Sequence, residues 1–436
     1  MDVRDERYAR RGRGVAVYSV TGMGSHRSRL PLAILVAVVA AGAATLILRP
    51  RSGLIDPAAV NPRAYFSARE LARARDFRNT QRALAVADLA VGGVALVVVV
   101  WRPPRRLLRR AARRPLLGAA AAGAAISVFV AVAELPLGAV MQHRAREVGL
   151  ATQGIGPWLV DAGKSTGVSA VLAAGGGALA LALIRRFRRR WWAPAAVCVV
   201  VLGVLSQYLF PVVVAPLFNR FEPLPQGRLR SEVLALARRA GVDVGQVYRV
   251  DASRRTTGTN AYVDGIGRTK RVVLYDTLIG SYPRRELLSV VAHELGHVKH
   301  RDVPRGLLWL AIVAPAGTYL VQQLAERLGR REGLGDPRAR PGPEVLPALA
   351  LALALVSFAL GAGSNVLSRK VEASADGFAL RLTRDPEAFI DVERRLAISN
   401  LIDPSPPRVL QVLFGTHPTT DERIGYAVAI ERGARP

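Results

Sequence analysis

Long apolar stretches without charged residues alternate with arginine-rich connections along most of this chain. Seven of these stretches hold about 20 residues each, near 30–48, 83–101, 116–141, 166–184, 192–215, 305–323 and 345–367. A helix rises about 1.5 Å per residue, so each stretch is long enough to cross the apolar core of a bilayer, about 30 Å thick. The pattern predicts a predominantly α-helical, polytopic membrane protein with about seven membrane helices.

Two of the seven stretches allow a choice of interpretation. The first follows an arginine-containing leader, but its apolar run is longer than that of a cleavable signal peptide and ends in LILRPR, which favours a retained helix. Glu134 and Pro136 interrupt the third stretch. Either Glu134 faces the bundle interior or a wet cavity, or that helix ends near residue 133.

Two longer polar segments follow a different pattern. LRSEVLALARRAGV (229–242) has helical apolar spacing, and QVYRVDAS, NAYVDGI and KRVVLYDTLI read as three short strands. PRRELLSVVAHELGHVKHRD then reads as a helix. Residues 368–436 are expected to be mainly helical, with a break at the proline-rich DPSPPR, 403–408. A short β-sheet is therefore expected among the helices.

Composition narrows the range of partners. The formal net charge is +28, and the arginines lie between the apolar runs, which indicates contact with anionic lipid headgroups at a membrane surface. We see no basic surface interleaved with aromatic residues, so nucleic acid is not an expected partner. The single cysteine, Cys198, excludes an internal disulfide framework and a cysteine-based zinc finger.

The stretch SVVAHELGHVKHRD, residues 289–302, holds three of the six histidines. On a helix, His293 and His297 project from one face, one turn apart, as two imidazole ligands of one zinc ion do. Glu294 lies beside the first histidine, where a carboxylate can take a proton from water that zinc activates. This H-E-x-x-H pattern is typical of metalloproteases, although so short a motif also occurs by chance on surface helices that bind no metal.

A third protein ligand must come from elsewhere in the chain. The longer motif with a third histidine requires glycine at position 300 and histidine at position 303, where this chain has His300 and Val303. Glu372, on a helix after the seventh run that can return to the motif, is the predicted third ligand. Asp376, one turn later, is placed to accept a hydrogen bond from the second nitrogen of a ligand histidine. The alternative for both carboxylates is a solvated helix face.

These patterns divide the chain into five parts. We expect a disordered leader at 1–25, membrane helices one to five in 26–215, a zincin-like α+β segment in 216–304, membrane helices six and seven in 305–367, and a helical segment in 368–436. A protease holds its peptide extended, and pairing with an exposed edge strand fixes the register of that peptide. NAYVDG can be this edge strand or an ordinary hairpin.

Several motifs together resemble the M48 peptidases, and within them the Ste24-type CAAX prenyl proteases. They are HELGH, the pattern N-x-x-S-R-x-x-E-x-x-A-D from Asn365 to Asp376, the late HPTTDERI, and the stretch NAYVDGIGRTKRVVLYDTLI (260–279) before the histidine helix. The resemblance implies a barrel of seven membrane helices around a large chamber. It also implies one zinc ion per chain and the hydrolysis of peptide bonds in a peptide or protein substrate.

The resemblance assigns roles to single residues as well. It implies that His293, His297 and Glu372 bind zinc, that Glu294 is the catalytic glutamate, that Asn260 and Ala261 lie beside the substrate backbone, and that His417 lies near the active site. A donor at His417 can stabilise the tetrahedral oxyanion, although Pro418 also suggests a simple helix start. Arg369 can pair with Asp376 or a neighbouring carboxylate, or approach the substrate.

The family resemblance and the distribution of positive charge predict opposite orientations of the protein in the membrane. The resemblance implies catalytic segments that face the cytoplasm, and we keep that expectation. The leader and the connections at the far end of the apolar runs carry 24 arginines, whereas the loops 49–82 and 143–165 on the catalytic side carry 11 lysines and arginines. The positive-inside rule therefore favours a catalytic segment outside the cell.

The substrate also stays open. A prenylated C-terminal peptide suits a chamber accessible to lipid, but the arginine-, alanine- and glycine-rich composition suggests a bacterial genome, and bacteria generally lack prenylation. Quality-control cleavage of membrane proteins is the rival enzymatic function. A non-catalytic membrane scaffold that kept the fold is the alternative outside the enzymes.

Overall fold

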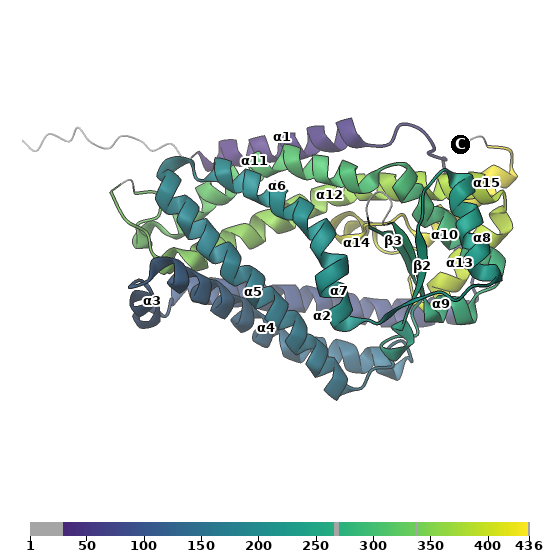
Figure 1. The fold of residues 1–436 in the computed structure, drawn as a ribbon, viewed down its shortest axis with the longest axis horizontal. Helices are drawn as coiled ribbons and strands as arrows, with labels where there is room; N and C mark the ends of the chain where they lie inside the picture. Colours follow the sequence, from purple (N-terminus) through teal and green to yellow (C-terminus); the bar gives the residue numbers. More distant parts are fainter. Residues whose placement is uncertain (1–28, 266–269, 337, 435–436) are drawn as a thin grey trace, which may run out of the picture.

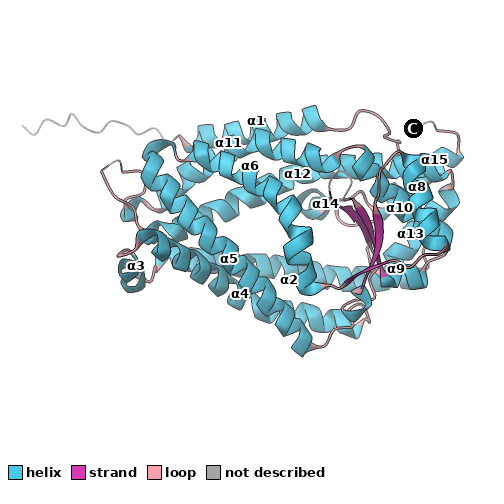
Figure 2. Cartoon of the chain, in the orientation of Figure 1, coloured by secondary structure: helices cyan, strands magenta, loops and turns pink. Residues whose placement is uncertain are grey.

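The computed structural model describes residues 29–265, 270–336 and 338–434. Within them the chain is mostly helical and has one small sheet (Figure 2). Seven of the described helices are long and apolar enough to cross a membrane, as the hydrophobic pattern predicted. The leader expected at 1–25 lies outside the described residues.

Six of the seven long helices form a closed ring, and the seventh packs against two of them. The seven helices are α1 (Leu30–Leu48), α2 (Ala68–Trp101), α4 (Pro115–Glu147), α5 (Ile155–Phe187), α6 (Trp192–Leu209), α11 (Asp302–Leu328) and α12 (Leu346–Thr383). Contacts run from α2 to α4, α5, α6, α11 and α12 and then back to α2, while α1 packs against α11 and α12 (Figure 1). The outward apolar side chains stay exposed because lipid is the expected solvent there.

Small residues bring neighbouring membrane helices close together. A Cβ atom on Gly177 of α5 would lie 2.8 Å from the carbonyl oxygen of Ala119 in α4, and one on Gly123 would clash with the carbonyl oxygen of Ala173. Glycine is therefore required where α4 and α5 cross, as in other membrane helix pairs.

The helix α4 continues through Glu134 and Pro136, so the interpretation in which it ends near residue 133 is wrong. A membrane helix tolerates an internal proline when neighbouring groups satisfy the freed backbone. The Glu134 carboxylate lies over Gly92 of α2, where any Cβ atom would clash with it. This carboxylate therefore faces a neighbouring helix, which favours the interpretation that it points into the bundle.

A small sheet and four helices form the segment between α6 and α11. The helices are α7 (Ala215–Phe218), α8 (Arg228–Ala240), α9 (Asp276–Ser281) and α10 (Arg284–Lys299), and the strands are β1 (Phe221–Pro223), β2 (Gln246–Val250), β3 (Ala261–Asp264) and β4 (Arg271–Tyr275). The prediction missed β1 because three residues with a terminal proline show no alternation. It also extended the last strand too far. The Asp276 carboxylate accepts the N–H groups of Thr277 and Ser253, and the chain turns there into α9.

The strand order in the sheet is β1-β2-β4-β3. β2 and β4 are parallel, and the two outer pairs are antiparallel. β3, from the stretch NAYVDG, lies at the edge of the sheet and pairs with β4 alone among the described strands. Because β4 is the next strand along the chain and is antiparallel to β3, this position fits both the edge-strand and the hairpin interpretation. The buried side chains of Val291, Ala292 and Leu295 on α10 belong to the core that includes the sheet.

We had expected a separate helix after the last membrane helix to return to the histidine motif. The structure does not have this turn. Instead α12 is one helix of 38 residues, and its second half continues alongside α10. No proline interrupts the stretch 364–383, so nothing in the sequence ends the helix at the membrane boundary. The expected boundaries 304/305 and 367/368 accordingly fall inside α11 and α12.

Three helices complete the end of the molecule that carries the sheet. They are α13 (Pro386–Ser399), α14 (Arg408–Phe414) and α15 (Thr420–Glu431). The proline-rich stretch 403–408 separates α13 from α14, as predicted. Figure 1 shows α8, α10, α13 and α15 gathered around the sheet at one end of the long helices.

Candidate active site

Two helices bring three potential metal donors together. His293 and His297 lie one turn apart on α10, and their Nε2 atoms are 3.1 Å from each other. Glu372 on α12 places Oε2 3.2 Å from Nε2 of His293 and Oε1 3.6 Å from Nε2 of His297. The structure thus brings the three predicted ligands into one group, with donor atoms within 4.8 Å of one another.

Small side chains allow α10 and α12 to approach this closely. A Cβ atom on Gly296 would lie only 3.2 Å from the Cα atom of Ala375. Ala373, Ser374 and Ala375 are all buried at the contact. Small residues on both helices therefore set the distance between the histidine pair and Glu372.

Each imidazole is oriented by a carboxylate on its other nitrogen. His293 Nδ1 lies 2.7 Å from Asp376 Oδ1, and His297 Nδ1 lies 3.0 Å from Asp302 Oδ2. Because an ionised carboxylate only accepts, each Nδ1 donates, and both Nε2 atoms point at the same place. The geometry supports the expected role of Asp376 as the carboxylate that accepts a hydrogen bond from a ligand histidine. The same role of Asp302 toward His297 was not predicted.

The donor set fits a metal cation. With both Nδ1 atoms donating, the two neutral imidazoles turn Nε2 lone pairs toward each other at 3.1 Å, and a cation bound by both lone pairs removes their repulsion. Glu372 Oε2 is buried and has no hydrogen-bond partner among the described residues. Two nitrogens bound at about 2.0–2.1 Å in a tetrahedral site lie about 3.3 Å apart, close to the observed separation.

The histidines lose protons when a cation binds. Burial lowers the pKa of His297, but its contacts with Asp302 and Glu372 outweigh burial and raise the pKa to about 9. The pKa of His293 is raised well above its usual value, against burial, by Asp376 and Glu372. Metal binding at neutral pH must therefore release protons and weaken as the pH falls.

A buried arginine supports the carboxylate behind His293. Arg423 of α15 donates from Nε to Asp376 Oδ2 at 2.9 Å, and its Nη1 forms an ion pair with Glu393 Oε2 at 2.8 Å. Asp376 and Glu393 are both buried, so one guanidinium contacts two acidic side chains in a region that excludes water. Burial raises the pKa of Glu393 to about 7, which lessens the negative charge that Arg423 must balance. Sequence reasoning missed Arg423 and Glu393, although Arg423 stands inside the HPTTDERI motif.

Glu294 is adjacent to the donor group and is half-buried. Burial raises the pKa of its carboxyl above the usual value, while the neighbouring His293 and His297 oppose that shift. A carboxylate with a raised pKa is a stronger proton acceptor, and general bases are often tuned in this way.

His417 reaches the donor group from the segment between α14 and α15. Its Nε2 atom lies 3.5 Å from Glu372 Oε2. The cap of α15 is Thr419, whose side chain accepts the N–H of Glu422. His417 therefore stands outside the helix, and the geometry favours a role at the site over that of a helix-start residue.

Arg369 and Asn365 hold this segment to α12. Arg369 Nη1 donates to the carbonyl oxygens of Gln411 at 3.0 Å and Gly415 at 2.6 Å. Asn365 Nδ2 donates to the carbonyl oxygen of Leu413 at 2.8 Å. Of the alternatives for Arg369, pairing with Asp376 is wrong, because Arg423 occupies that carboxylate. Arg369 instead positions the backbone that precedes His417.

The edge strand β3 lies next to α10. Asn260 accepts the N–H of Tyr275 at its carbonyl oxygen, and its side-chain oxygen accepts the N–H of Ala261 at 2.8 Å. Hydrogen-bonded pairs alternate along an antiparallel ladder. The backbone groups of Val263 and the carbonyl of Ala261 therefore point away from β4, toward the open side of the sheet.

Comparisons with known proteins agree with this geometry. A family model described as "Peptidase family M48" matches residues 223–431, and one described as "CAAX prenyl protease N-terminal, five membrane helices" matches residues 70–220. The "Uncharacterized metalloprotease YhfN" of Bacillus subtilis is 32% identical over 303 residues, which are 69% of this chain and 71% of that relative. The chain belongs to peptidase family M48.

Further relatives place this M48 peptidase in the Ste24-type branch. The "CAAX prenyl protease 1 homolog" of Arabidopsis thaliana is 36% identical over 186 residues, and the aligned part spans 42% of this chain and 43% of that relative. The crystal structure of Ste24p from S. mikatae matches with a TM-score of 0.74 and 19% identity, over 91% of this chain and 98% of that one. The expected membrane-chamber fold, family and class of metalloendopeptidase are thereby confirmed.

Removing the third donor should release the metal. In the M48 peptidase, Glu372→Ala leaves two imidazoles, and we expect metal affinity to fall at least about tenfold. Metal content after dialysis against a chelator measures this. His417→Ala is the matched control, since it touches the same carboxylate without being a donor, and it should keep the metal while slowing cleavage. Unchanged metal content in Glu372→Ala would place the third ligand elsewhere.

Removing the buried guanidinium should destabilise the fold. Arg423→Met leaves Asp376 and Glu393 buried without their shared guanidinium partner, which costs about 3–5 kcal/mol. Arg285→Met is the control, because Arg285 pairs with Asp385 while 60% of its side chain is exposed, and such pairs contribute about 0–1 kcal/mol. Thermal unfolding compares the two variants, and equal decreases in Tm would contradict the argument.

Proposed function

We propose that the protein is a zinc endopeptidase in which His293, His297 and Glu372 hold the zinc ion. The observation that carries this proposal is the convergence of two carboxylate-oriented imidazoles and one carboxylate on a single point. Three protein ligands with an open fourth position are typical of catalytic zinc sites. Zinc supplies a Lewis acid that polarises the scissile carbonyl and acidifies water.

The side chains around the zinc ligands carry the proton transfers. Glu294 takes a proton from the attacking water and later gives it to the leaving amine nitrogen. The raised pKa of Glu294 makes its carboxylate a stronger proton acceptor in the first of these steps. His417, next to Glu372, donates a hydrogen bond to the oxyanion of the tetrahedral intermediate.

The substrate is proposed to be an extended peptide that adds to β3. Val263 and Ala261 offer backbone groups on the open side of the sheet, next to α10. Asn260 and Ala261 begin this strand and so lie beside the substrate backbone. Pairing of this kind fixes the register of the peptide without selecting its sequence.

Substrates are proposed to reach the site from the membrane, as lipid-modified or membrane-embedded peptides. Glu372 lies on α12, and the first part of this helix is a candidate membrane span. The site is therefore close to the bilayer surface. The names of the CAAX prenyl protease relatives support this substrate class. We further propose that the catalytic segments face the cytoplasm, the orientation that the resemblance implies and that the arginine distribution opposes.

Glu294→Gln should retain the metal and lose cleavage by about 10²-fold or more, because the amide accepts no proton. In the unchanged enzyme, activity should fall toward acid pH as Glu294 becomes protonated, at a pH above the usual glutamate range near 4.3. Peptide cleavage against pH and metal analysis measure both effects. A Glu294→Gln enzyme that still turns over would remove the general-base role.

The same variant, used as a trap in native membranes, identifies the substrate class from the proteins it retains.

Val263→Pro removes one N–H on the open side of β3 and should lower kcat/KM for peptides about tenfold. Proline is tolerated on an edge strand when its missing N–H faces away from the ladder. Val263→Ile keeps the N–H and serves as the control. Equal kcat/KM for the two variants would exclude substrate pairing at this residue, provided both retain the metal.

Cysteine labelling tests the orientation. Cys198→Ala gives a background without cysteine, into which Arg106→Cys and Glu387→Cys place one thiol at each end of the long helices. A membrane-impermeant maleimide applied to intact cells should label Arg106→Cys and spare Glu387→Cys. Labelling of Glu387→Cys alone would put the catalytic segments outside the cell.

A further inference from the structure

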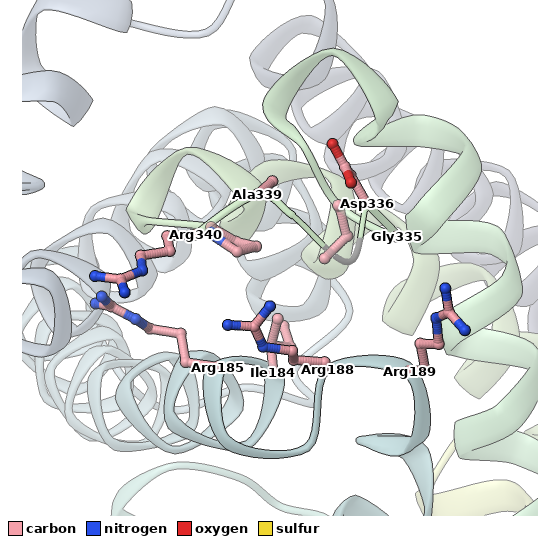
Figure 3. A pocket seen from close by; sticks show the side chains of 10 residues that line it. Ile184, Arg185, Arg188, Arg189, Gly335, Asp336, Ala339 and Arg340 are labelled. Atoms are coloured by element: carbon pink, nitrogen blue, oxygen red, sulfur yellow. The ribbon is translucent and has the colours of Figure 1, made fainter.

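Four arginines line one cavity that the peptidase site does not use. The cavity has a volume of about 240 Å³ and lies between the end of α5 with the following turn and the connection from α11 to α12. The guanidinium groups belong to Arg185, Arg188, Arg189 and Arg340 (Figure 3).

This cavity lies at the end of the long helices away from the metal donors. α5 begins beside the catalytic segment, where Asp161 accepts a hydrogen bond from Arg255 at 2.8 Å. A helix of 33 residues is about 50 Å long, and the cavity lies at its other end. The turn at Arg188, with φ of +44°, ends this membrane helix. The cavity is therefore expected at the boundary between membrane and water.

Three of the four cavity arginines have no described carboxylate that balances their charge. Among the described residues, no carboxylate forms an ion pair with Arg185, Arg189 or Arg340. Asp336 is the one carboxylate in the lining, and its Oδ1 atom already accepts the backbone N–H of Arg338 at 2.8 Å. Figure 3 shows the side chains of Arg185 and Arg340 extending toward one another from opposite walls. Both arginines are exposed, so water screens part of their repulsion, and an anion between them would replace that repulsion by attraction to both.

We propose that this cavity binds a phosphate-bearing anion. Guanidinium groups match phosphate oxygens with pairs of parallel hydrogen bonds, and several arginines from two segments can hold one phosphate together. The buried side chains of Ile184 and Leu334 line the same cavity and reduce water access to these contacts. At a membrane boundary the phosphate belongs to the headgroup of an anionic phospholipid or to free inorganic phosphate.

Two arginine pairs with equal charge test this assignment. The full chain in non-ionic detergent is titrated at constant ionic strength with phosphatidylglycerol, with phosphatidylcholine and with inorganic phosphate. Lipid occupancy is read by native mass spectrometry and phosphate binding by calorimetry. Arg185→Gln/Arg340→Gln removes two charges from the cavity, and Arg106→Gln/Arg113→Gln removes two charges from the arginine-rich stretch near α3 (Arg105–Ala111), outside the cavity.

We expect the cavity pair to weaken binding at least about tenfold and the control pair to leave it nearly unchanged. Loss of phosphatidylglycerol binding alone identifies a lipid headgroup as the source, and loss of inorganic phosphate binding identifies the free ion. Equal weakening by both pairs, or no binding of either anion to the unchanged protein, overturns the proposal. If the cavity pair does not fold, as judged by Tm and metal content, Arg340→Gln alone replaces it with the same criteria.

Discussion

The close contact between α10 and α12 is the constraint on which the catalytic centre depends. Gly296 and Ala375 let the two helices approach until Glu372 reaches the histidine pair. A larger side chain at either position would separate donors that must lie within one coordination sphere. The metal site is thus a property of helix packing as much as of the three donor residues, and the small residues around Glu372 have a functional reason to be small.

Behind this contact, charge is arranged in layers. The donors face one another, the carboxylates of Asp376 and Asp302 hold their imidazoles, and Arg423 holds Asp376 together with Glu393. Each layer fixes the orientation of the one inside it. The segment that carries His417 is fixed separately by Arg369 and Asn365, both on α12. One helix therefore provides a metal donor, a carboxylate that orients a histidine, and the two side chains that position the segment of His417.

Much of this arrangement could be predicted from the sequence because its signals are local. Apolar length identifies the seven membrane helices, and helical spacing places His293 and His297 on one face. Alternation with turn residues located β2, β3 and β4, although it extended β4 past its end at Tyr275. Glu372 and Asp376 followed from the need for a third ligand and from their one-turn spacing on a helix, and the resemblance to a known family supported Glu372. The role of Asn260 followed from that resemblance alone.

What the sequence could not provide was the set of contacts between distant segments. Arg423 stands 47 residues after Asp376, and no spacing rule connects them. Asp302 ends the quoted histidine stretch, yet its partnership with His297 depends on the sharp turn between α10 and α11, where Arg301 has a φ of +57°. The path of α12 was wrong for a related reason, because hydropathy marks where a membrane segment ends and not where its helix ends.

The continuity of α12 also orders events during synthesis. The two histidines leave the ribosome 75 or more residues before Glu372, and α11 and the first half of α12 lie between them. A nascent chain that has only the histidine helix lacks its third donor, and the donor arrives on a helix that must first insert into the bilayer. Hydrolytic competence is therefore withheld until the last span is in place and the enclosure around the active centre has formed.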